Sequence, residues 1–293
     1  MNRYDIVFIG QMGTMTVVPF IGPPFIEHNS PVIFSALAAS WPGIRVAAVT
    51  KVPLGKEDLL EPLRAGGIDV IASPGEIGEI RVKLPSANPD ERQARVVKFG
   101  DTFRIDDIPP FEPCLVHLCC FGPRDILLGL MRAMKARGCR LSVDMQSFVL
   151  QPDGETGAVH LKDVPEKKEI LAMTDFVKLD AVEAQTLTGV DVLQRQAEIL
   201  EEWGSTETVI TCAEGALARG RGTTAFLKFA NGSTRGRMGR GDTAMGSYLA
   251  RRLDHSVEES LRFAVALTSL KLETVGPFKG TLQDILERMK RVT

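Results

Sequence analysis

The sequence of 293 residues predicts a three-layer α/β fold, in which helices cover both faces of a mainly parallel sheet. Short apolar runs alternate along the chain with amphipathic segments, and such alternation is typical of right-handed βαβ units. Hydrophobic residues make up 44% of the chain, which suits a globular fold with a large core. Two segments, 12–27 and 76–104, depart from this alternation.

Strands are expected where apolar runs are short and are bounded by turn residues. These runs lie at 4–10, 44–49, 115–119, 141–144, 175–179 and 208–211. Helices are expected where apolar residues recur every three or four positions. These segments lie at 32–39, 54–65 and 125–137, and further helices begin near Asp242 and Ser256. Gly67 and Gly138 stand where two of the helices should end, and Ser256 to Glu259 form a capping box.

The two exceptional segments differ from each other in composition. Segment 12–27 is apolar and contains several prolines and glycines. Segment 76–104 has a strict polar and apolar alternation from Glu79 to Leu84, and a second candidate strand follows from Arg95 to Phe99. This pattern predicts antiparallel strands with one solvated face.

Charge and composition exclude several classes of protein. The formal net charge is −2, so no strong field favours nucleic acid or an anionic membrane. Proline and glycine interrupt the longest apolar stretches, and no membrane span is expected. The N-terminus has no apolar block of the signal-peptide type, which makes the cytoplasm the expected location. The five cysteines lack a Cys-x-x-Cys pair and are interpreted as buried structural residues.

The segment Gly239-Arg240-Gly241-Asp242-Thr243 carries the strongest functional signal. Glycines allow a tight turn and the close approach of a ligand. The free N–H groups of a helix start attract anions, and an amphipathic helix is expected to begin at Asp242. A carboxylate beside such a turn suits a general base that deprotonates a hydroxyl during phosphoryl transfer. The competing interpretation is an ordinary helix N-cap, for which Asp is a favoured residue.

The wider context resembles the ribokinase-like (PfkB) carbohydrate kinase family over nearly the whole chain. Gly239 to Gly246 resembles the family's Gly-Ala-Gly-Asp-x-Phe-x-Gly signature, although Arg240 stands where Ala or Gly is commoner. The segments 178–189 and 209–215 are similar to the Lys-Leu-Asn-x-x-Glu-Ala…Leu-Thr-Gly and Ile-Thr-x-Gly-x-x-Gly motifs. Together with Asp144-Met145-Gln146, the signature looks most like the members that phosphorylate inositol and keto-sugar acids.

The resemblance implies an ATP-dependent kinase that phosphorylates a hydroxyl of a small sugar, polyol or sugar acid. Asp242 would be the general base, and Gly239, Arg240 and Gly241 would hold the transferring phosphoryl group. Mg²⁺ would be ordered by Asp180 and Glu183, whose alternative role is the exposed first turn of a helix. ATP would contact residues in the C-terminal half, namely Lys178, Asp180, Thr211, Glu214, Gly215, Val265, Thr268 and Ser269. The implied core comprises 1–11, 28–75 and 105–293. The implied small β-sheet lid over the substrate comprises 12–27 and 76–104, for which the alternative is a plain surface hairpin insertion.

The acceptor half departs from the family pattern. The first β-loop has no acid, Asn29-Ser30 replaces a Gly-Gly pair, and the Asp144 to Phe148 segment lacks the family's Arg. The remaining polar candidates for binding a polyol are Gln11, Asn29, Asp144 and Gln146. Each of them has the alternative role of capping local backbone.

These departures leave two alternatives to a carbohydrate kinase. One is a nucleoside kinase of the same fold, and the other is a kinase-derived protein that binds nucleotide or metabolite with little turnover. The expected partner is a small molecule, with neither nucleic acid nor membrane. The resemblance also allows a monovalent cation as a cofactor and a homodimer formed through the lid.

Overall fold

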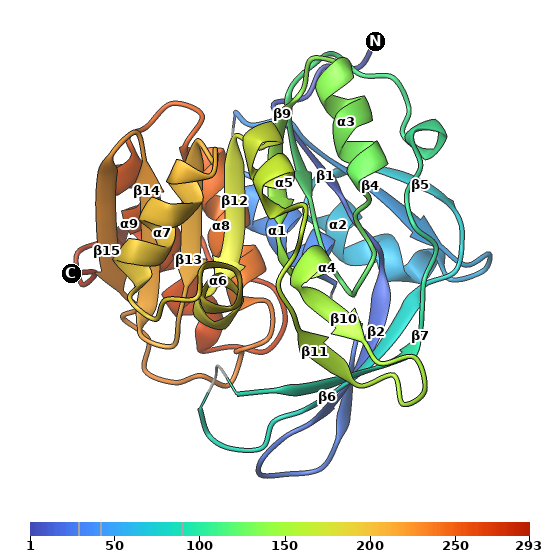
Figure 1. Cartoon of the computed structure of the whole chain (residues 1–293), viewed down its shortest axis with the longest axis horizontal. Helices are drawn as coiled ribbons and strands as arrows, with labels where there is room; N and C mark the ends of the chain where they lie inside the picture. The colour runs from blue at the N-terminus through green and yellow to red at the C-terminus, as the bar shows by residue number, and fades with distance from the viewer. Residues whose placement is uncertain (29, 42, 89–90) are drawn as a thin grey trace.

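The computed structural model describes residues 1–28, 30–41, 43–88 and 91–293. A nine-stranded sheet, the large sheet, has the order β15-β14-β13-β12-β9-β8-β1-β4-β5 (Figure 1). Neighbours from β13 to β5 pair in parallel, whereas β14 and β15 form an antiparallel edge. Its strands are β1 (Ile6–Ile9), β4 (Val46–Val52), β5 (Asp69–Pro74), β8 (Leu115–Leu118), β9 (Arg140–Asp144), β12 (Phe176–Asp180), β13 (Glu207–Thr211), β14 (Gly215–Gly220) and β15 (Thr223–Lys228).

Helices cover both faces of the large sheet, as the sequence predicts. Alternate residues of β1 point to opposite faces. Ile6 and Phe8 join one buried cluster, and Val7 and Ile9 join the other. The first cluster includes residues of α1 (Pro31–Ala39), α2 (Glu61–Ala65), α8 (Arg240–Arg251), α9 (Val257–Leu272) and α10 (Leu282–Met289). The second includes residues of α3 (Leu128–Ala136), α4 (Gln146–Val149), α5 (Lys167–Met173), α6 (Ala181–Thr188) and α7 (Leu193–Glu202).

A second sheet, the small sheet, lies below the large one in Figure 1. It contains β3 (Phe25–Glu27), β2 (Gly13–Val18), β6 (Gly78–Lys83) and β7 (Gln93–Lys98), in that order. The predicted alternation is confirmed, because β6 buries every second residue. The predicted antiparallel pairing holds for β2–β3 and β6–β7 but is wrong for β2–β6, which are parallel. β2 follows β1 and β6 follows β5, and these two parallel strands of the large sheet lead the chain out in one direction.

Two predicted helices are shorter than expected. Segment 54–65 divides into a 3₁₀ turn, η1 (Glu57–Leu60), and α2, which has Pro62 in its first turn. Proline has no N–H to donate, so it suits a helix start better than a helix interior. Segment 125–137 becomes helical only at Leu128, because Asp125 accepts hydrogen bonds from the amides of Phe121 and Gly122 in a preceding turn.

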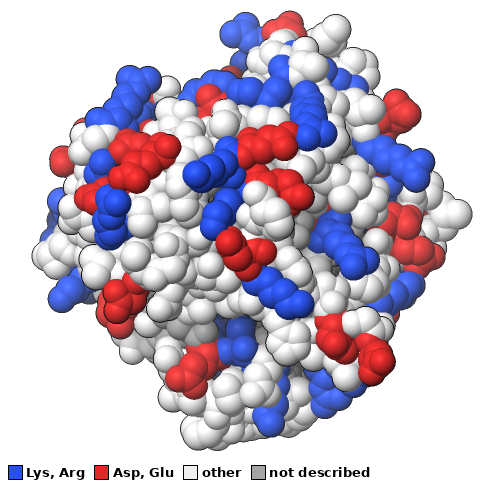
Figure 2. All heavy atoms as spheres, in the orientation of Figure 1, with Lys and Arg blue, Asp and Glu red and all other residues white. Residues whose placement is uncertain are grey.

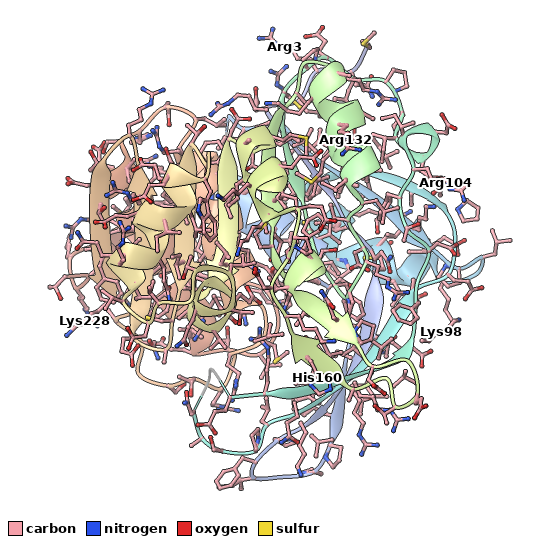
Figure 3. All side chains as sticks on the ribbon, viewed as in Figure 1. Arg3, Lys98, Arg104, Arg132, His160 and Lys228 are labelled. Carbon is pink, nitrogen blue, oxygen red and sulfur yellow. The ribbon has the colours of Figure 1, made fainter. Side chains whose placement is uncertain are left out.

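The remaining elements are a second 3₁₀ turn, η2 (Ile105–Asp107), and a hairpin of β10 (Leu150–Pro152) and β11 (Val159–Leu161). His160 is exposed on β11, and Lys228 lies at the left edge of the view (Figure 3). Positive and negative side chains are mixed over the face shown in Figure 2, in keeping with the small net charge. In the part of the chain that is described, no helix is both long enough and apolar enough to cross a membrane.

Candidate active site

The glycine-rich turn before α8 has the geometry of an anion site. Gly239 is the N-cap of α8 and has a φ of +76°, a left-handed conformation that favours glycine. A Cβ atom at Gly239 would lie 2.4 Å from the ring of Phe34, so the turn is also closely packed. Gly241 and Asp242 occupy the first helical turn, where N–H groups have no partner within the helix. The helix starts two residues earlier than predicted, and Asp242 is its third residue.

Asp242 lies next to a buried chain of charged groups. The Nζ of Lys178 is 3.3 Å from Oδ1 of Asp242 and 2.6 Å from Oδ2 of Asp144. Lys178 and Asp144 are aligned neighbours on the parallel strands β12 and β9, which explains their contact. The Asp242 side chain is 14% exposed, whereas that of Asp144 is fully buried. Lys178 therefore links a carboxylate that can meet a ligand to one that cannot.

Burial alone would disfavour a charged ammonium at position 178. The carboxylates of Asp144, Asp242 and Glu183 outweigh that effect and raise the pKa of Lys178 well above its usual value. Lys178 therefore stays protonated at neutral pH. A fixed positive charge at this place can orient the Asp242 carboxylate and also attract a phosphoryl oxygen.

A second charged group joins the small sheet to the large one. Asp180 caps α6 and forms a capping box with Glu183. Arg92, just before β7, donates to Asp180 at 2.8 Å and to Glu183 at 3.2 Å. Burial raises the pKa of Glu183 to about 8, and the neighbouring Asp180 adds to this shift. The Arg92 guanidinium, next to the small sheet, is thus a cation supplied to two carboxyl groups, one at the end of β12 and one at the start of α6.

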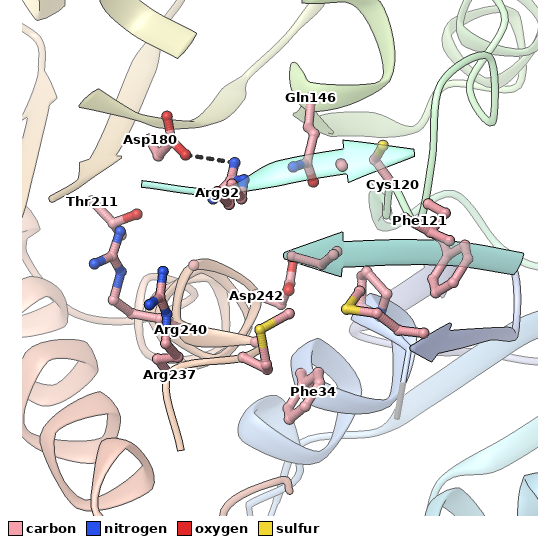
Figure 4. A pocket seen from close by; sticks show the side chains of 18 of the residues that line it. Phe34, Arg92, Cys120, Phe121, Gln146, Asp180, Thr211, Arg237, Arg240 and Asp242 are labelled. Atoms are coloured by element: carbon pink, nitrogen blue, oxygen red, sulfur yellow. Dashed lines mark hydrogen bonds and ion pairs between the residues drawn. The ribbon is translucent and has the colours of Figure 1, made fainter. Parts of the chain in front are cut away.

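These groups face one cavity between the two sheets (Figure 4). Its charged end is lined by Arg92, Lys178, Asp180, Glu183, Arg237, Arg240 and Asp242. Its apolar end is lined mainly by Met15, Phe34, Ile80, Val82, Leu84, Ala94, Phe121, Leu150 and Met238, with Glu27 and Gln146 as polar residues. In Figure 4 Asp242 is drawn between Arg240 on one side and Phe34 on the other, at the boundary between the two ends. The cavity can therefore hold an anion on one side of Asp242 and a less polar molecule on the other.

The structure brings only some of the predicted donor residues into this cavity. Lys178, Asp180, Thr211 and the turn from Gly239 to Asp242 line it. Glu214 is exposed, and Gly215 is buried at the start of β14. The α9 residues Val265, Thr268 and Ser269 are fully buried in the core. The hydroxyl of Ser269 is already used, because it donates to the carbonyl of Val265 and accepts from the amide of Ala230.

The predicted acceptor residues are scattered. Gln146 lines the cavity, but Asp144 is enclosed with Lys178. Gln11 lines a separate small pocket and donates to the carbonyl of Asp101 at 2.8 Å. Asn29 lies outside the described residues. The neighbouring Ser30 is buried and accepts a hydrogen bond from the amide of Gly13 at 2.8 Å, so it ties the small sheet to α1.

Several lining residues were missed from the sequence. Phe34 and Phe121 look like ordinary core residues in a linear pattern, and Arg92 lies in a segment with no motif. Glu27 carried a usable signal, because it is the one carboxylate in the apolar segment 12–27. It is buried and lines the cavity.

Asp180 and Glu183 fit a divalent cation in part. Carboxylate oxygens suit Mg²⁺, and both side chains line the charged end of the cavity. The described residues contain no cluster of three or more His, Cys, Asp or Glu side chains that could hold a metal ion. Protein oxygens alone would thus leave most of the coordination to water and substrate, as Mg²⁺ commonly accepts.

Comparison with solved structures gives matches over almost the whole chain. A pyrophosphate-dependent kinase in the ribokinase family, complexed with a pyrophosphate analog and myo-inositol, is 26% identical with a TM-score of 0.86; the match covers 96% of this chain and 99% of that one. A pyrophosphate-dependent myo-inositol-1 kinase, converted by mutation into a myo-inositol-3 kinase, is 25% identical with a TM-score of 0.84 and 98% coverage of both chains.

More distant structures share the fold. Ribokinase from Arabidopsis thaliana, complexed with ribose and ATP, has a TM-score of 0.73 at 16% identity, and the match covers 98% of this chain and 99% of that one. No family model matches the chain. No curated protein matches it either.

Proposed function

The chain is a phosphotransferase of the ribokinase-like (PfkB) family, close to its inositol kinases, and we propose that it phosphorylates a hydroxyl group of a small polyol of the inositol type. Asp242 is the general base in this proposal, and the turn from Gly239 to Asp242 holds the transferring phosphoryl group. The observation that carries it is the position of Asp242 in one cavity, between Arg240 on one side and Phe34 on the other (Figure 4).

The reaction follows from this arrangement. An acceptor hydroxyl beside Asp242 loses its proton to the carboxylate while its oxygen attacks the phosphorus atom. The N–H groups of the first turn of α8 and the ammonium of Lys178 stabilise the charge on the phosphoryl oxygens. Asp180 and Glu183 would hold Mg²⁺, which when bound neutralises charge on the donor phosphates.

The acceptor is proposed to lie against the apolar end. The ring of a polyol has C–H faces that can pack on Phe34, Phe121 and Ile80, while its hydroxyls need polar partners. Gln146 and Glu27 are the polar side chains placed to supply them. The small sheet contributes Ile80 and Arg92 to the same cavity, so we propose that it acts as a lid over both substrates.

We propose pyrophosphate as the phosphoryl donor. Arg92, Lys178, Arg237 and Arg240 surround the charged end, which suits a compact and highly charged anion. The α9 residues that should contact adenine are sealed in the core. The inositol kinases with the similar structures described above are themselves pyrophosphate-dependent. ATP is the second candidate, because the Thr211–Gly215 segment resembles a nucleotide loop and Thr211 reaches the cavity.

The experiment is a matrix of donors and acceptors. Pyrophosphate and ATP, each with Mg²⁺, are combined with myo-inositol, ribose, fructose, a keto-sugar acid, adenosine and cytidine, and formation of the phosphate monoester is measured. We expect turnover with pyrophosphate and a cyclic polyol. Turnover with ATP alone would show that the proposed donor is wrong but that the protein is a kinase. Turnover only with a nucleoside would show that the proposed acceptor class is wrong. Binding of a donor without turnover on any acceptor would favour a binding protein.

A further inference from the structure

Lys271 is a buried cation next to the anion turn. It lies on α9 and is fully buried. Its Nζ donates hydrogen bonds to the backbone carbonyls of Gly236 and Met238 and lies 4.8 Å from the centroid of the Phe34 ring. Lysine is rarely buried completely unless it is paired, because desolvating the charge is costly. The carboxylates that act on this ammonium at longer range are Glu27 and Asp242.

The two carbonyls belong to the segment that leads into the site. Met238 directly precedes Gly239, the N-cap of α8. The amide of Gly236 donates to the carbonyl of Leu272 at 2.8 Å, so the end of α9 holds this segment through its backbone as well as through Lys271. A Cβ at Gly236 would lie 1.8 Å from the carbonyl oxygen of Thr274, which shows how closely the two backbones approach.

Backbone carbonyls that converge on one buried point are the ligands of a hard monovalent cation. The family resemblance allows such a cation as a cofactor. Here the convergent carbonyls of Gly236 and Met238 are already occupied by the ammonium of Lys271. A dissociable ion does not fit in the same place, because the protein has put its own positive charge there.

We propose that Lys271 is a built-in substitute for a monovalent cation, which holds the anion turn in its binding conformation and makes the enzyme independent of K⁺ and Na⁺. Lys271 is a positioning residue, since it acts through the backbone that precedes Gly239. The proposal rests on the proposed kinase activity, but its binding arm can be tested without turnover.

The first test uses the unaltered protein. Phosphoryl transfer and pyrophosphate binding are measured in choline, sodium and potassium chloride at constant ionic strength, the binding by titration calorimetry. We expect the rate and the affinity to be the same in all three salts. A requirement for K⁺ or Na⁺ in either measurement would overturn the proposal. If no acceptor is turned over, the proposed function fails. The pyrophosphate affinity in the three salts then decides alone whether the anion turn is independent of K⁺ and Na⁺.

The second test removes the built-in charge. Lys271→Ala leaves space for an ion, whereas Lys271→Met fills the space with an apolar chain. In choline chloride we expect both variants to lose about 10²-fold in rate, the loss typical of a misplaced catalytic group. Potassium or ammonium ions should restore Lys271→Ala and leave Lys271→Met unchanged. A Lys271→Ala variant that keeps the full rate in choline, or that no cation restores, would contradict the proposal.

Lys51 offers a matched control. It is also a buried lysine whose Nζ donates to a backbone carbonyl, that of Thr102 at 3.1 Å, and it forms an ion pair with Asp107 at 2.9 Å. It does not line the central cavity. Lys51→Ala should therefore lower stability without making the rate or the pyrophosphate affinity dependent on K⁺.

Discussion

Lys178 shows how one side chain can serve two carboxylates of different function. It holds Asp144 in the core and stands beside Asp242 at the cavity. If either carboxylate were removed, only the other would remain to compensate the buried charge of Lys178. The ion pair with Lys178 therefore explains why an aspartate stands at position 144, even if Asp144 does not contact the acceptor.

Lys271 predicts a pH dependence of the reaction. Burial lowers the pKa of Lys271 to about 8, although the carboxylates of Glu27 and Asp242 oppose the shift. As the pH rises through about 8, the ammonium loses its charge, so the rate should fall. The stability contribution runs the other way: from about pH 8 to the ordinary value of 10.5, the folded chain binds fewer protons than the unfolded chain, and stability rises with pH.

The measurement is the rate from pH 6.5 to 9.5 for the unaltered protein and for potassium-restored Lys271→Ala. The descending limb near pH 8 should disappear in the restored variant, because K⁺ does not titrate. An identical descending limb in both proteins would assign the titration to another group.

Among the elements, the start of α8 depends most on its backbone conformation. Gly239 has a left-handed φ, and its missing Cβ makes room for Phe34 of α1. Gly239→Ala should therefore displace the anion turn and lower the rate by about 10²–10³-fold, the usual effect of losing an anion-stabilising donor.

Gly222→Ala is the matched control for that variant. Gly222 has a φ of +77° in the turn between β14 and β15, and nothing lies within 4 Å of its added Cβ. Backbone strain should lower the stability of both variants in urea unfolding, and the contact with Phe34 should lower that of Gly239→Ala further, but only Gly239→Ala should lose activity. Equal loss of activity in both would mean that the turn before α8 has no special role.

The small sheet shows where a pattern of single residues stops being informative. Alternation from Glu79 to Leu84 predicts a strand with one buried face, and that is what β6 has. The alternation contains no information on the partner strand. The parallel pairing of β6 with β2 depends on where the chain leaves the large sheet, after β1 and after β5. The contact of Arg92 with Asp180 joins residues 88 positions apart and has no local signal.

In the whole molecule, the large sheet was the most predictable part. Its parallel strands β1, β4, β8, β9, β12 and β13 were expected as short apolar runs, whereas the edge strand β5 was not, because it is only partly buried and contains polar residues. Asp242 and its turn were predictable because their chemistry lies in consecutive residues. Gln11 and Asp144 were expected at the acceptor but are enclosed elsewhere, since their environment comes from strands that are distant in the chain.

The environment of the donor site also depends on segments that are distant in the chain. The sequence motifs indicate where a nucleotide would bind, but only tertiary packing shows that Val265, Thr268 and Ser269 are buried. The cations at the charged end of the cavity come from three places, namely Arg92 next to β7 of the small sheet, Lys178 on β12 of the large sheet, and the arginines at the start of α8. The family relationship and the kinase chemistry thus agree with the sequence, while the choice of pyrophosphate is a proposal from the assembled site.

The most direct test of the central claim compares Asp242→Asn with Asp284→Asn by ³¹P NMR. Both aspartates are the third residue of a helix, but Asp284 lies in an exposed capping box of α10, outside the cavity. With pyrophosphate and the acceptor found to be active, the unaltered protein and Asp284→Asn should give a phosphate monoester at similar rates. Asp242→Asn should be slower by about 10²–10⁴-fold, the range for a lost general base. A monoester formed by Asp242→Asn at the full rate would contradict the account.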